Sequence, residues 1–138
     1  MNRDYIRKVS FGLGIDESLP SDPLVWAQNQ FDNVPYFIWE KKLPTLEEQR
    51  DRYGHWDHLR KVTGERFFES LELSVRHTTA LASGSPAFER MWHFWGNFFA
   101  ISEKDFLASF STGVYQREII RPNMVNTFED LVYAVTTS

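Results

Sequence analysis

One segment near residues 85–99 constrains the fold most, because apolar and aromatic side chains follow one another there at helical spacing. Ser85 and Pro86 match a helix start, in which a polar cap precedes a proline at the first helical position. The large apolar residues at i, i+3, i+4, i+7 and i+11 are Phe88, Met91, Trp92, Trp95 and Phe99. Phe94 and Phe98 lie off that stripe. A helix that is apolar on nearly all sides is usually buried on nearly all sides, so we expect this one at the centre of a bundle.

Polar caps and apolar repeats predict further helices along the chain. We expect one helix over about 22–32, a second from the capping box at Thr45 and Glu48 to about 62, and a third from after Gly64 to Ala82. A fourth helix should run through Tyr115 and end by Pro122, and a last one should start at Thr127. The two prolines and bunched aromatic residues between Asn33 and Pro44 predict an irregular connector. No β alternation is sustained. We therefore predict an all-α fold, a compact bundle of about five to seven helices around the central buried aromatic helix.

The composition indicates a single helical domain over residues 1–138 that contains a large aromatic core. The chain has 12 Phe, 5 Trp and 5 Tyr, and each ring brings roughly 150–250 Å² of buriable surface. The net charge of −4, with both signs interleaved, argues against nucleic acid as a partner. The lack of cysteine excludes disulfides and thiolate metal sites. No apolar run fits a secretion signal or a membrane span, and no cofactor is indicated.

Two histidines are the candidate metal ligands. His55 and His58 lie at i,i+3, so both imidazoles could bind one divalent ion if a third ligand came from elsewhere. The alternative is a solvated helix face, since charged residues crowd the same stretch. The His-Glu-x-x-His and Glu-x-x-His motifs of zinc proteases and di-iron bundles are missing.

A polar line on the central helix is the candidate catalytic or ligand-binding site. Glu89, His93 and Asn97 lie at i, i+4 and i+8, and Glu89 could orient and charge His93. The alternative is a hydrogen-bonded network that fixes helix register. On the preceding helix, Glu72 and Arg76 are expected to pair at i,i+4.

Arg117 and Arg121 are the candidate anion ligands. They lie at i,i+4 near a helix end, where positive charge also complements the helix dipole. Paired guanidinium groups would suit a carboxylate or a phosphate. The sequence leaves both readings open.

Three blocks of sequence lie in the last third of the chain. They start at Met91, Tyr115 and Phe128 and read Met-Trp-His-Phe-Trp-Gly-Asn-Phe-Phe-Ala-Ile-Ser, Tyr-Gln-Arg-Glu-Ile-Ile-Arg-Pro and Phe-Glu-Asp-Leu-Val-Tyr-Ala-Val. In their order and spacing these blocks resemble the bacterial family DUF1800. Looser similarity extends to Phe11-Gly-Leu-Gly and Asp22-Pro-Leu-Val-Trp. The family pattern commonly has histidine at the position of Phe98 and glycine at that of Asn126. Phe98 cannot replace an imidazole, whereas asparagine tolerates the left-handed backbone and so is expected to keep that turn.

The resemblance implies that this chain is the N-terminal piece of a longer family architecture. It also implies that relatives in this family often look exported. A missing remainder would leave apolar helix faces uncovered, so we expect a homodimer or packing against that remainder. Three functions are compatible with the sequence, and we favour the first of them. The first is a structural or interaction module, the second a part of a histidine-centred or metal-assisted hydrolase, and the third a binder of an apolar small molecule.

Overall fold

A computed structural model describes residues 2–14, 17–39, 42–54, 65–101 and 106–138. The secondary structure of these residues is helical and contains no strand, which confirms the predicted all-α class. In chain order the helices are α1 (Asn2–Val9), α2 (Pro23–Asn29), α3 (Leu46–Gly54), α5 (Glu65–Ala82), α6 (Pro86–Phe98), α7 (Phe106–Tyr115), a π-helix (Gln116–Ile120), α8 (Arg121–Asn123) and α9 (Phe128–Thr137). Within these ranges no helix is both long and apolar enough to cross a membrane.

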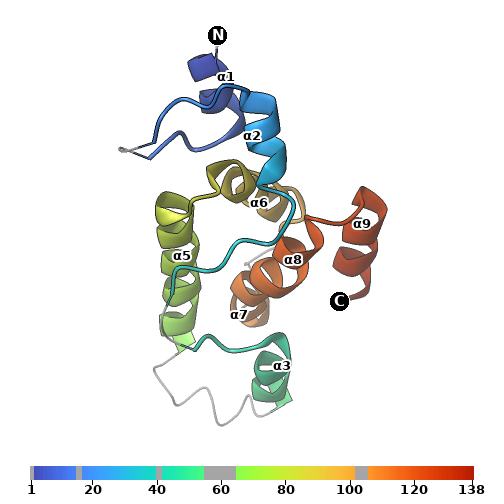
Figure 1. The fold of residues 1–138 in the computed structure, drawn as a ribbon. Helices are drawn as coiled ribbons and strands as arrows, with labels where there is room; N and C mark the ends of the chain where they lie inside the picture. The colour runs from blue at the N-terminus through green and yellow to red at the C-terminus, as the bar shows by residue number, and fades with distance from the viewer. Residues whose placement is uncertain (1, 15–16, 40–41, 55–64, 102–105) are drawn as a thin grey trace.

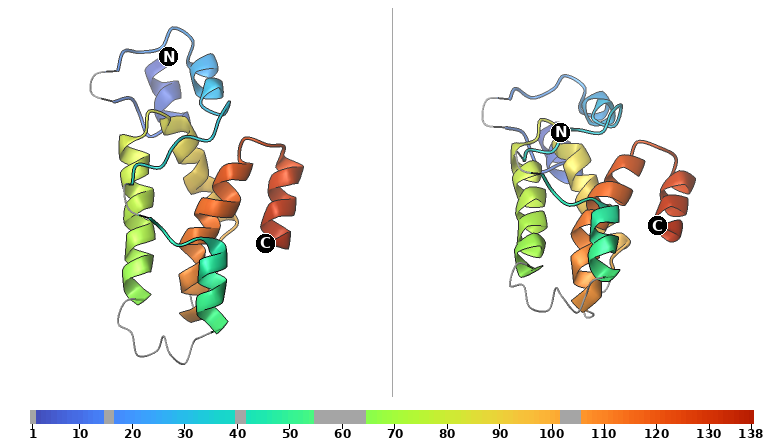
Figure 2. Two further views of the ribbon diagram at one scale, coloured as in Figure 1. Left: turned by 60° about the horizontal axis from the view of Figure 1, so that its bottom comes forward. Right: turned by 90° about the horizontal axis from the view of Figure 1, so that it is seen from below.

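The helices pack around a central rod, which consists of α7, the π-helix and α8 in direct succession (Figure 1). α5 runs along one side of the rod and α9 along the other, and α6 contacts both α5 and the π-helix (Figure 2). α3 packs on α7, while α1 and α2 lie at the other end of the molecule, beside the start of α6. The rod therefore contacts most of the other elements.

Local capping motifs set several of the helix starts. The Asp22 carboxylate accepts hydrogen bonds from two backbone N–H groups of α2 at 2.9 and 3.1 Å. The predicted capping box at Thr45 and Glu48 is confirmed, with reciprocal bonds of 2.9 and 3.1 Å. A second capping box joins Thr127 and Asp130 at the start of α9. Each motif satisfies backbone donors that a helix start leaves without a partner.

α6 contributes the centre of the core with one of its faces only. Phe88 and Trp92 are 0% and 2% exposed, whereas Phe94 and Phe98 are 53% and 64% exposed. The prediction of burial on nearly all sides is therefore wrong for α6, because no described element covers its other face. The buried core cluster consists of Phe88, Trp92, Tyr115, Ile120, Met124 and Leu131.

The predicted helix end before Pro122 is also wrong, because the rod continues through this proline to Asn123. In the π-helix the Arg121 N–H bonds to the Gln116 carbonyl, one residue further back than in an α-helix. The wider turn comes directly before Pro122, which lacks an N–H and would otherwise press its ring against the preceding turn. Proline then occupies the first turn of α8, where its missing donor costs little.

The turn at Asn126 does not use the left-handed backbone that we expected there. Among the described residues, only a glycine, Gly12, has a positive φ. The Asn126 N–H instead bonds to the Asn123 carbonyl at 3.2 Å, and the two side-chain amides bond to each other. One backbone bond and one side-chain bond between the same two residues therefore close this turn.

Candidate functional site

Glu89 and Arg121, which the sequence assigned to two different sites, form one buried ion pair. Arg121 Nη1 donates to Glu89 Oε2 at 2.6 Å, and Nη2 donates to Oε1 at 2.7 Å. The two side chains are 1% and 0% exposed. This bidentate pair joins α6 to α8 and neutralises both charges inside the protein.

Aromatic rings surround the Arg121 guanidinium. Its central carbon lies 4.6 Å from the ring centres of Phe37 and Trp92 and 4.9 Å from that of Phe88. Nη2 also donates to the Pro35 carbonyl at 3.0 Å. Cation–π contacts of this kind are favourable when the cation is desolvated. Arg121 thus fastens the connector between α2 and α3 onto the core.

Arg117 lies in a second ion-pair network. Its Nη2 is 2.9 Å from Glu72 Oε1, and its Nη1 is 3.0 Å from Glu118 Oε1. Nη2 also donates to the Pro44 carbonyl, while Glu118 Oε2 accepts from the Leu46 N–H at the start of α3. The network joins α5, the π-helix and α3. Both candidate anion ligands therefore already bind carboxylates of their own chain.

Glu72 pairs across helices and not with Arg76 at i,i+4 as predicted. Gly113 makes room for it, since a Cβ there would lie 2.5 Å from the Cβ of Glu72. Arg76 donates to the side-chain oxygen of Gln116, whose own backbone carbonyl accepts from Trp92 Nε1 at 2.8 Å. Glu72, Arg76 and Trp92 therefore each find a hydrogen-bond partner on the rod.

The three residues of the polar line on α6 have different surroundings. Glu89 is fully buried against Arg121, His93 is half-buried, and Asn97 is exposed. The ring of His93 stacks on that of His77 from α5, with centroids 6.1 Å apart and planes 14° apart. His77 was not singled out from the sequence, because helix packing alone brings it to His93.

His93 is held in its neutral form. Its Nε2 is buried and has no hydrogen-bond partner among the described residues. Burial is the largest cause of a lowered pKa at His93, and together with the positive charge of Arg76 and the neighbouring His77 it brings this pKa to about 4. A neutral imidazole with a free ring nitrogen could accept a proton or a metal ion. In the described ranges, however, no three His, Cys, Asp or Glu side chains gather to hold a metal ion.

The two candidate metal ligands, His55 and His58, lie outside the described residues. The two alternatives for this pair, a metal site and a solvated helix face, therefore both stay predictions.

The lowered pKa of His93 predicts that acid weakens the fold. The unfolded chain binds this proton near pH 6.5 and the folded chain only near pH 4. Between these values the unfolded state holds more protons, so the free energy of unfolding should fall as the pH drops from about 6.5 to about 4. Urea denaturation at several pH values measures this. The His93→Gln variant should lose less stability than the wild type over the same interval, whereas parallel curves would contradict the assignment.

Aromatic side chains form a continuous exposed surface over α6 and α9. Phe94, Phe98 and Phe128 are each more than half exposed, and Trp95 and Phe99 lie half-buried beneath them. The rings of Phe94 and Phe98 stack at 6.1 Å, and Trp95 lies 5.6 Å from both Phe98 and Phe128. We call these five residues the exposed aromatic surface. Contiguous apolar patches of this kind mark interaction sites on soluble proteins.

Comparison with known proteins gives one family match. No curated protein and no solved structure matches the chain. The model of the family described as "Protein of unknown function (DUF1800)" matches residues 7–138. This range contains all three blocks that carry the resemblance, together with the two looser segments before them. The chain therefore belongs to the DUF1800 family.

Proposed function

We propose that this chain is an interaction module whose exposed aromatic surface binds a second copy of the same chain. The observation that carries the proposal is the cluster of rings on α6 and α9, three of which are more than half exposed. The two ion-pair networks support a module of this kind, because their charged groups bind one another and hold helices together.

A second copy suits this surface because its five side chains are uncharged, so the same five side chains of another copy can pack against them. Aromatic rings pair both face to face with an offset and edge to face. The surface already shows both arrangements, with planes 22° apart for Phe94 and Phe98 and 90° apart for Trp95 and Phe98. A two-fold axis would place the same rings on both sides of an isologous contact.

The oligomeric state tests this proposal. We expect the weight-average mass in sedimentation or light scattering to rise with concentration from 16.3 kDa toward twice that value. Because each copy carries a net charge of −4, moderate salt should screen the repulsion and favour the dimer. The Phe98→Glu variant should weaken association about tenfold or more, since central aromatic side chains dominate most interfaces.

Leu81→Glu is the matched control, because Leu81 is an exposed apolar residue (86%) on α5, away from the aromatic surface. This variant should associate like the wild type. A wild-type chain that stays monomeric at all concentrations, or equal effects of the two variants, would rule out the proposed contact.

A further inference from the structure

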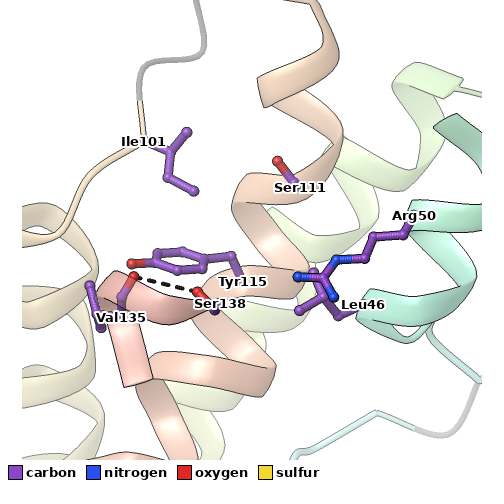
Figure 3. Close-up of a pocket in the computed structure, with 7 residues that line it drawn as sticks. All are labelled: Leu46, Arg50, Ile101, Ser111, Tyr115, Val135 and Ser138. Carbon is purple, nitrogen blue, oxygen red and sulfur yellow. Dashed lines mark hydrogen bonds between the residues drawn. The ribbon is translucent and has the colours of Figure 1, made fainter. Parts of the chain in front are cut away.

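A second feature, separate from the exposed aromatic surface, is a pocket of about 300 Å³ between α3, α7, α9 and the segment after α6 (Figure 3). Its lining residues are Leu46, Arg50, Ile101, Ser111, Tyr115, Val135 and Ser138. Figure 3 shows Arg50 entering from one side and Val135 from the other, with the Tyr115 ring between them. At ~30 Å³ for each water-sized group, the volume of the pocket has room for a ligand of about ten non-hydrogen atoms.

The two ends of the pocket differ in chemistry. Leu46, Ile101 and Val135 supply aliphatic wall, and the buried Tyr115 supplies an aromatic face. Arg50 is exposed and brings a guanidinium group to the rim. A ligand that matches this lining has an apolar body and one charged end that stays near solvent.

The charge at the rim selects an anion. A guanidinium group binds a carboxylate with two parallel N–H donors. Burial raises the pKa of Tyr115, so its hydroxyl stays protonated and adds no negative charge to the pocket. Figure 3 shows this hydroxyl at the end of the ring away from Arg50. Among the described residues that line the pocket, Arg50 alone is an arginine, and Arg117 on the rod is already bound to Glu72. Arg50 is therefore the arginine that the structure places at the pocket.

We propose that this pocket binds a small monocarboxylate with an apolar body. The carboxylate lies on Arg50, and the body packs on the Tyr115 ring between Ile101 and Val135. This binding does not depend on self-association, because the pocket and the exposed aromatic surface share no residue.

Three ligands of matched size test the proposal, namely phenylacetate, 2-phenylethanol and phenethylamine, titrated into the full chain by calorimetry or ligand-observed NMR. We expect phenylacetate to bind at least fivefold more tightly than the alcohol, and the amine to bind most weakly. The Arg50→Gln variant should lose about fivefold to tenfold in phenylacetate affinity and should bind the acid and the alcohol alike. Val135→Phe, which fills the pocket, should abolish binding of both.

Arg3→Gln is the matched control, because Arg3 is exposed on α1 at the opposite end of the molecule. Its affinity should equal that of the wild type, and Phe98→Glu should also keep it. A melting curve for each variant verifies folding. Equal affinity for acid and alcohol in the wild type, an equal effect of Arg50→Gln and Arg3→Gln, or no saturable binding would overturn the proposal.

Discussion

Replacing Arg121 by methionine is expected to lower the free energy of unfolding by about 3–5 kcal/mol, one of the two largest effects that we predict for a single substitution. The reason is Glu89, whose fully buried carboxylate accepts two hydrogen bonds from Arg121. Methionine fills much of the same space, so the loss comes mainly from a buried charge without a partner. Urea denaturation monitored by tryptophan fluorescence measures this change.

Two further variants separate the unpaired charge from the loss of packing. In Glu89→Gln/Arg121→Met the charge is gone, so the double variant should recover a large part of the lost stability. Lys42→Met breaks an ion pair with Glu48 whose side chains are 78% and 43% exposed, and should cost less than about 1 kcal/mol. An Arg121→Met variant as stable as Lys42→Met would show that the buried pair contributes little.

Trp92→Ala is expected to cost a similar amount, about 3–5 kcal/mol, because it empties the centre of the core. Trp92 is 2% exposed and lies against Phe37 with ring centroids 5.6 Å apart. Its Nε1 donates to the Gln116 carbonyl in the π-helix at 2.8 Å, and alanine leaves that acceptor without this donor. The same denaturation experiment reports the loss.

Phe98→Ala is the control on the same helix, because its ring is 64% exposed. This variant should change the stability of the monomer by less than about 1 kcal/mol, since it leaves no buried cavity. If Trp92→Ala and Phe98→Ala were equally harmful, the division of α6 into a buried and an open face would be wrong.

The features that could be predicted from the sequence are the ones that neighbouring residues determine. The capping box at Thr45 and Glu48 lies within four consecutive residues, so its geometry does not depend on the rest of the fold. The all-α class likewise follows from caps and helical spacing repeated along the chain. Packing enters neither inference, and both are confirmed.

The buried charges could not be assigned in this way, because their partners lie far apart in the sequence. The i,i+4 spacing of Glu89 and His93 suggests a contact on one helix, yet Glu89 binds Arg121, 32 residues away. Inside a bundle the low dielectric makes a bidentate partner on a neighbouring helix the stronger choice. Spacing within one helix cannot reveal which residue a neighbouring helix will present.

The exposed aromatic surface was only partly visible in the sequence. Phe94 and Phe98 lie off the apolar stripe of α6, so the sequence indicated a second apolar face, which we wrongly predicted to be buried. The structure leaves that face open, with Phe128 of α9 beside it. Membership of the DUF1800 family defines no activity, so the proposals of self-association and of carboxylate binding depend on the geometry of the chain itself.

Because of the π-helix, the number of residues in the rod matters for its structure in a way that it does not for the loops of the chain. The bond from the Arg121 N–H to the Gln116 carbonyl encloses one residue more than an α-helical turn does, so deleting a single residue between Gln116 and Ile120 would restore ordinary α-helical turns. The ring of Pro122 would then press against the turn before it, where the wider π-turn now leaves room. We therefore expect this stretch to accept substitutions more readily than the loss of a residue, as long as Pro122 follows it.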